Sequence, residues 1–127
     1  MKQHILIVED NSTALLVEKM LMRTLNCEVD GVESGNEALQ LITKRHDEYT
    51  LVLLDLGLPD IDGTEVCKKI REFESNAHTN HIPIIAVTGN NDLTEHQKCL
   101  DVGMEEVVTK PLTKERASAL LIKYSAT

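Results

Sequence analysis

The chain of 127 residues is long enough for one domain with a buried core, and its 42% of apolar residues exclude a disordered polymer. Its formal net charge of −8 argues against direct binding of nucleic acid, because such binding needs Lys and Arg to neutralise the phosphates. No apolar run is long enough for a membrane span and no signal-peptide pattern is present, so we expect residues 1–127 to form a single cytoplasmic domain without membrane contact.

The first two predicted strands flank an amphipathic helix. The apolar run HILIV at 4–8 predicts a buried strand, and residues 11–25 are predicted to be helical. The apolar residues expected on one face of this helix are Leu15, Leu16, Met20, Leu21 and Leu25. Residues 27–32 alternate in polarity, which is typical of an edge strand.

A second helix and a third strand follow. Ser34 and Glu37 have the spacing of a capping box, which predicts the start of a helix over 35–46. The apolar run LVLLD at 51–55 predicts a buried strand that ends in the carboxylate of Asp55. Because a carboxylate next to buried apolar chain is costly unless it is compensated, Asp55 becomes the first candidate for a functional residue.

The centre of the chain continues the alternation. A helix is predicted over 63–74, a polar loop over 74–81 and a strand over 82–88. A further helix is predicted over 92–102, with Gly103 in the position that glycine favours just past a helix end.

The chain closes with a strand at 105–109 and a helix at 113–124. Five repeats of strand then helix predict an α/β protein with a parallel sheet and helices on both faces. In open parallel sheets, ligands bind beyond the carboxyl ends of the strands, so the residues at those ends are the ones to consider.

Charged and polar side chains stand at four strand ends. Glu9 and Asp10 follow the first strand, Asp55 ends the third, Thr88 ends the fourth, and Lys110 follows the fifth. Crowded carboxylates repel one another, so either their pKa values rise or a cation lies between them. Mg²⁺ suits such a site, because it prefers oxygen ligands and takes one or two protein carboxylates.

Each of these residues also has an ordinary structural interpretation. Acidic residues such as Glu9 and Asp10 are favoured at a helix start, Thr88 is a common strand residue, and Lys110 could form an ion pair with one of the acids. The proline after Lys110 restricts the backbone and is a candidate for a cis peptide bond. The combination of all five at neighbouring strand ends favours a functional site.

Four motifs resemble those of the receiver domain of two-component response regulators. They are IVEDN (7–11), LLDLGLPDIDG (53–63), IIAVTGN (84–90) and VVTKP (107–111), and the resemblance covers essentially the whole chain. It implies a flavodoxin-like, doubly wound (βα)5 fold with five parallel strands in the order 2-1-3-4-5.

The resemblance implies a phosphoacceptor function. Asp55 matches the aspartate that takes a phosphoryl group from a phosphohistidine, and Thr88 and Lys110 match the hydroxyl and the lysine that bind this group. The implied partner is therefore a histidine kinase or a histidine phosphotransfer domain.

The resemblance also implies a Mg²⁺ cofactor, which Mn²⁺ can replace. Glu9 and Asp10 match the acidic pair of the metal site, with Asp10 as a direct ligand and Glu9 acting through water. Asp55 shares the metal, and Gly57 offers its backbone carbonyl. Asp60, although acidic and close in sequence, is expected to be a loop residue outside this cluster.

One position departs from the family pattern. Many receivers carry Tyr or Phe three residues before the lysine as a rotameric switch, but Val107 stands here, so an aromatic readout is not expected. This absence and the wording DLGLPDIDG resemble receivers of hybrid sensor histidine kinases; a stand-alone regulator or a phosphorelay intermediate is the alternative. No DNA-binding output domain is expected in the chain, and homodimer formation stays open.

Other classes fit the sequence less well. Mg²⁺-dependent phosphohydrolases with an aspartyl-phosphate intermediate place the nucleophile in a DxD pattern after the first strand, where this chain has Glu-Asp-Asn. The phosphate-binding patterns GxxxxGK[ST] and GxGxxG are absent, which argues against a nucleotide-binding module. A degenerate receiver would lack part of the acidic set. The scattered Cys27, Cys67 and Cys99 predict reduced thiols rather than disulfides.

Overall fold

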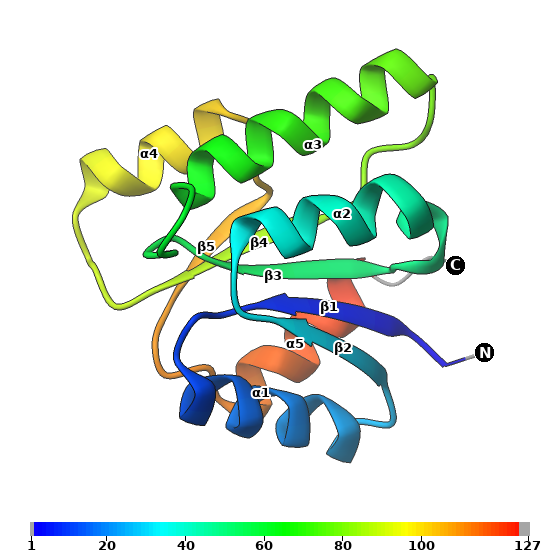
Figure 1. The fold of residues 1–127 in the computed structure, drawn as a ribbon. Helices are drawn as coiled ribbons and strands as arrows, with labels where there is room; N and C mark the ends of the chain where they lie inside the picture. Colours follow the sequence, from blue (N-terminus) through cyan, green and yellow to red (C-terminus); the bar gives the residue numbers. More distant parts are fainter. Residues whose placement is uncertain (1, 125–127) are drawn as a thin grey trace.

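The structure is a computed structural model and describes residues 2–124. Strands and helices alternate along the chain (Figure 1). In chain order they are β1 (His4–Val8), α1 (Ser12–Thr24), β2 (Glu28–Val32), α2 (Gly35–Arg45), the 3₁₀ turn η1 (His46–Glu48), β3 (Leu51–Asp55), α3 (Gly63–Ala77), β4 (Ile84–Thr88), α4 (Leu93–Asp101), β5 (Glu106–Thr109) and α5 (Lys114–Tyr124).

The five strands form one parallel sheet in the order β2-β1-β3-β4-β5, which confirms the predicted fold class and strand order. The strand at 27–32, predicted to lie at an edge, does so as β2. β1, β3 and β4 lie inside the sheet, and all five residues of β3 and of β4 are buried. Apolar runs without polar alternation are what such interior parallel strands require.

Two apolar cores cover the two faces of the sheet. On one face, Ala38 and Ile42 of α2 pack with Val66 and Ile70 of α3 and with Cys99 of α4. On the other face, α1 and α5 supply the core side chains Leu15, Met22, Ala117, Leu120 and Leu121. Figure 1 shows the same division, with α1 and α5 on one side of the sheet and α2, α3 and α4 on the other.

The predicted start of α2 is confirmed. Ser34 is the N-cap, and its hydroxyl accepts a hydrogen bond from the Glu37 backbone N–H at 3.2 Å. The core-facing side of α1 differs from the prediction. Leu16 and Met20 are more than half exposed, while Glu18 is buried between Leu15 and Met22. A carboxyl group therefore occupies a position on the stripe that faces the sheet.

The prediction of a loop over 74–81 was wrong in its first half, because α3 continues to Ala77 and ends at His78, whose φ of 52° is left-handed. The reason is Glu74, which is fully buried and holds the chain together at this end of the sheet. Its carboxylate accepts hydrogen bonds from His46 Nε2 at 2.6 Å, from the Ile82 N–H at 2.7 Å and from Arg71 Nη1 at 2.8 Å. Within this polar stretch, Glu74 belongs to a buried network, whereas residues 79–81 form a loop as predicted.

The cysteines agree with their predicted state, since Cys27, Cys67 and Cys99 are all free and buried. Among residues 2–124, no helix combines the length and the apolar character that crossing a membrane requires.

Candidate functional site

The register of the sheet brings the predicted site residues to one edge. Val8 pairs with Leu54, so Glu9 and Asp10 emerge from β1 beside Asp55 at the end of β3. Asp55 in turn pairs with Val87, which places Thr88 one residue further along the next strand. These side chains come from separate strands, and only the parallel sheet makes them neighbours.

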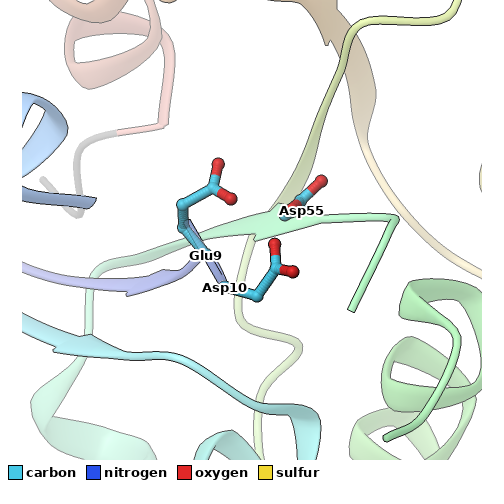
Figure 2. Close-up of side chains that lie close together, drawn as sticks. All are labelled: Glu9, Asp10 and Asp55. Atoms are coloured by element: carbon cyan, nitrogen blue, oxygen red, sulfur yellow. The ribbon is translucent and has the colours of Figure 1, made fainter. Parts of the chain in front are cut away.

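Three carboxyl groups converge at this edge (Figure 2). One carboxylate oxygen from each of Glu9, Asp10 and Asp55 lies within 4.8 Å of the other two, which is close enough for one metal ion to contact all three. Glu9 and Asp55 are buried, whereas Asp10 is exposed. Because the third carboxyl group is exposed, the cluster is open to solvent. Hard oxygen donors in this number suit Mg²⁺, so the residues present fit the cation that the sequence predicts.

Lys110 lies across the same cluster. Its Nζ donates to Glu9 Oε1 at 2.7 Å and is 3.6 Å from Asp55 Oδ1, so its tighter partner is Glu9. The peptide bond between Lys110 and Pro111 is cis, as the sequence suggested. Burial alone would lower the pKa of Lys110, but the hydrogen bond to Glu9 and the charge of Asp55 outweigh burial and raise it. Lys110 is therefore a firmly charged ammonium group.

The two buried carboxyl groups differ in their pKa values. Burial and the neighbouring Glu9 carboxylate raise the pKa of Asp55 to about 6, although the Gly57 N–H donates to Asp55 Oδ1 at 3.2 Å. Burial is the largest single influence on the pKa of Glu9 and acts to raise it. The hydrogen bonds from Lys110, Asp55 and the Asn11 N–H together outweigh burial and lower the value. Asp55 is thus the member of the pair whose charge is least compensated by protein groups.

Thr88 is buried at the end of β4, and its hydroxyl oxygen accepts a hydrogen bond from the Asn90 N–H at 3.1 Å. The Thr88 carbonyl accepts from the Lys110 N–H at 2.7 Å, so the two residues that were predicted to bind a phosphoryl group are joined through their backbones. Val107, at the position of the expected aromatic switch, is half-buried and packs against the core that α2, α3 and α4 cover.

The loop after Asp55 is fixed at both ends. At its base, the Gly63 N–H donates to the Leu56 carbonyl at 3.2 Å. Further along, Asp60 accepts hydrogen bonds from the N–H groups of Gly35 at 2.9 Å and Asn36 at 2.8 Å. Asp60 is a loop residue outside the acidic cluster, as expected, yet it anchors the loop to the start of α2. No sequence signal joins these segments, because the contact spans 25 positions.

One charged residue near the site was missed from the sequence. Glu18 of α1 is 8% exposed and lines a pocket of about 210 Å³ with the proline and lysine of the site. The pocket residues are Ala14, Val17, Glu18, Lys110, Pro111 and Leu112. The available signal was spacing, since Leu15, Glu18 and Met22 lie three and four residues apart, as residues on one helix face do.

Comparison with known protein families shows to which family the chain belongs. The family model of the response regulator receiver domain matches residues 5–122, nearly the whole chain. The chain is a receiver domain. It therefore belongs to two-component and phosphorelay signalling, in a family whose members are phosphorylated on aspartate.

Relatives of this receiver are parts of larger proteins. It is 36% identical over 121 residues to hybrid signal transduction histidine kinase L of Dictyostelium discoideum, covering 94% of the receiver and 7% of the kinase. It is 35% identical over 126 residues to the transcription factor SKN7 of Candida albicans, covering 97% of the receiver and 21% of that protein. The chain thus spans a small part of these curated relatives.

Solved structures share the fold of this receiver. The receiver domain of Saccharomyces cerevisiae Ssk1, crystallised with the histidine phosphotransfer protein Ypd1, superposes with a TM-score of 0.88 at 26% identity, over 97% of this chain and 88% of the other. The receiver domain of sensor histidine kinase PA1611 from Pseudomonas aeruginosa, which has a magnesium ion in its active-site cleft, gives 0.85 at 30% identity over 98% of both chains.

Proposed function

We propose that residues 1–127 act as one receiver domain that accepts a phosphoryl group from a phosphohistidine onto Asp55. The observation that carries this proposal is the meeting of three carboxyl groups and one ammonium group at the carboxyl ends of β1, β3 and β5. Asp55 is the candidate nucleophile because β3, the central strand of the sheet, holds it in place. The carboxyl groups of Glu9 and Asp10 and the ammonium group of Lys110 lie around it.

The chain's own groups account for the transfer. A carboxylate oxygen of Asp55 attacks phosphorus in line, the new oxygen–phosphorus bond forms, and the phosphorus–nitrogen bond to the histidine breaks, leaving that histidine to take up a proton. Lys110 neutralises charge on the phosphoryl oxygens, and the Thr88 hydroxyl donates to one of them. No general base is required, because the nucleophile is already a carboxylate.

Asp10 and Asp55 would hold Mg²⁺ directly by their carboxylates and Glu9 through a water molecule, with the Gly57 carbonyl as a backbone ligand. When bound, the cation supplies positive charge that offsets the developing charge of the phosphoryl group and the repulsion among the carboxylates. The magnesium-bound cleft of the PA1611 receiver supports this cation. Mn²⁺, which has similar preferences for oxygen ligands, is the expected substitute.

The proposed partner is a histidine kinase or a histidine phosphotransfer domain, and the co-crystal of Ssk1 with Ypd1 supports such a pairing. A partner must bring its phosphohistidine to Asp55 and so must cover the protein surface around the site. Leu16, Val17 and Met20 expose large apolar side chains on α1, the helix that begins just after Asp10. They supply apolar contact area where the partner has to dock.

The similarity to a hybrid histidine kinase supports a hybrid sensor kinase as the setting of this receiver. A transcription factor of similar identity supports the alternative, a receiver within a response regulator. Free, buried thiols at Cys27, Cys67 and Cys99 support a reducing compartment such as the cytoplasm. Neither setting changes the chemistry proposed for Asp55.

The test is labelling with acetyl phosphate and Mg²⁺, followed by intact mass. One phosphoryl group should add to the wild type, none to Asp55→Asn, and none to the wild type when the cation is chelated. Ser34→Ala, which changes only a helix cap on α2, is the matched control and should label like the wild type. An adduct that persists in Asp55→Asn contradicts the assignment of the acceptor.

A further inference from the structure

Glu18 is a buried carboxyl group without a compensating partner. It is 8% exposed, it lies on the side of α1 that faces the sheet, and it is flanked there by Leu15 and Met22. Within residues 2–124, the Glu18 carboxyl group makes no side-chain hydrogen bond and no ion pair within 4.0 Å, and its oxygens keep only a small contact with solvent. An isolated charge in such a position is strongly disfavoured, so the group has a physical reason to bind a proton.

The charges that face Glu18 come from the phosphoacceptor site. Burial raises the pKa of Glu18 to about 7, the charges of Glu9 and Asp55 raise it as well, and only Lys110 acts to lower it. Glu9 comes from the end of β1, Asp55 from the end of β3 and Lys110 from the segment after β5. Lys110 already forms ion pairs with Glu9 and Asp55, so its charge offsets the negative charge of an ionised Glu18 only in part.

We propose that Glu18 is a proton-linked positioning residue, which holds a proton until a divalent cation binds among Glu9, Asp10 and Asp55 and then releases it. The inference rests on the metal site proposed above. It assigns Glu18 no direct contact with the cation or the phosphoryl group; Glu18 acts through the electric field of the site and through Lys110, with which it shares a pocket.

The direction of the coupling follows from the signs of the charges. Two positive charges placed among the acids offset the negative potential that Glu9 and Asp55 exert on Glu18. The ionised form of Glu18 then becomes more favourable, its pKa falls, and the proton leaves. By linkage, a site that releases a proton as it binds the cation must bind that cation more tightly as pH rises.

The experiment is calorimetry of Mg²⁺ binding at pH 7 in two buffers of different ionisation enthalpy, which counts the protons released. A group with a pKa of about 7 is half protonated at this pH, so the wild type should release up to about half a proton more per Mg²⁺ than Glu18→Gln. Glu18→Leu should match Glu18→Gln, because both lack the titrating group, although their packing differs. The Mg²⁺ affinity of the wild type should also rise more steeply between pH 6 and pH 8.

A second measurement needs no variant. In the ¹³C spectrum of the wild type, the Glu18 carboxyl resonance should titrate near neutral pH, and saturating Mg²⁺ should move its midpoint to lower pH. Equal proton release by wild type and Glu18→Gln, or a midpoint that Mg²⁺ leaves in place, overturns the inference while the metal site stands. A wild type that binds no Mg²⁺ at all overturns the metal site and this inference with it.

Discussion

Replacing Glu74 by Ala should destabilise this receiver severely, although Glu74 is not part of the acidic cluster of Glu9, Asp10 and Asp55. The side chain is fully buried, and it satisfies the Ile82 N–H, His46 Nε2 and Arg71 Nη1 at distances of 2.6 to 2.8 Å. Removing it leaves the Arg71 guanidinium, one imidazole nitrogen and one backbone donor without their shared acceptor.

The magnitude follows from what is left unpaired. Breaking a buried ion pair by removing one partner lowers the free energy of unfolding by about 3–5 kcal/mol. This range already includes much of the penalty for leaving the remaining donors buried without an acceptor. Arg71 keeps its hydrogen bonds to the carbonyls of Gly103 and Ile82, so the expected loss is near the middle, about 4 kcal/mol. For a domain of this size, such a loss lowers Tm by roughly 15 °C.

The assay is urea and thermal unfolding followed by circular dichroism. Glu72→Ala is the matched control, since Glu72 is exposed on the same helix, and it should change stability by less than about 0.5 kcal/mol. Glu74→Gln keeps an acceptor for the Ile82 N–H and should fall between the two. If the free energies of unfolding of Glu74→Ala and Glu72→Ala differ by less than about 1 kcal/mol, the network does not stabilise the fold and the reasoning fails.

The pH dependence of the same variants checks the charge. Burial alone would raise the pKa of Glu74, but the hydrogen bonds from Ile82, His46 and Arg71 outweigh burial and lower it. A carboxyl group with a lowered folded-state pKa stabilises above its unfolded pKa of about 4.3, and that contribution is lost as pH falls through the folded value. The stability difference between wild type and Glu74→Gln should therefore shrink on acidification.

Three further predictions concern the site itself. Gly63→Ala should lose about 1–3 kcal/mol of stability, because the added Cβ would lie 2.8 Å from the Asp55 carbonyl oxygen. The Cβ of the control variant Gly57→Ala would meet nothing within 4 Å, so this variant should unfold like the wild type in the same urea series. Lys110→Ala should slow acetyl phosphate labelling by about 100-fold or more at unchanged secondary structure, as measured by time-resolved intact mass, and labelling at the wild-type rate would contradict the role of its charge. Asp60→Ala should lower Tm by less than Glu74→Ala does, since the two hydrogen bonds that it removes at the start of α2 are part-buried or exposed and those of Glu74 are largely buried. Asp60→Asn should recover part of the loss.

The sheet and the site were largely readable from the sequence because both rest on local patterns. Apolar runs predict the strands. The rule that ligands bind beyond the carboxyl ends of parallel strands predicts one shared edge for the candidate residues Glu9, Asp10, Asp55, Thr88 and Lys110. The register of the sheet then supplied the contact distances, which no local pattern contains.

The features that the sequence did not predict depend on contacts between segments that are distant in sequence. A polar stretch at 74–81 predicts a loop by composition, and only the tertiary partners His46 and Arg71 explain why Glu74 is buried in a helix. The choice of Glu9 over Asp55 as the closer partner of Lys110 is a matter of side-chain geometry. For α1, the apolar residues Leu16 and Met20 suggested the wrong face, since the helix instead turns Glu18 toward the sheet.

The anchoring of the loop after Asp55 has a consequence for the entropy of metal binding. Residues 56–62 have the length of a flexible connection, but the hydrogen bond from Gly63 to Leu56 closes its base and Asp60 fastens it to α2, so the longest span between fixed points is residues 57–59. Gly57 stands in this short span. Its conformational freedom is lost when the domain folds, not when the cation arrives. If the Gly57 carbonyl is a ligand of the cation, as proposed above, it is preorganised, and we expect no loss of affinity from ordering the loop.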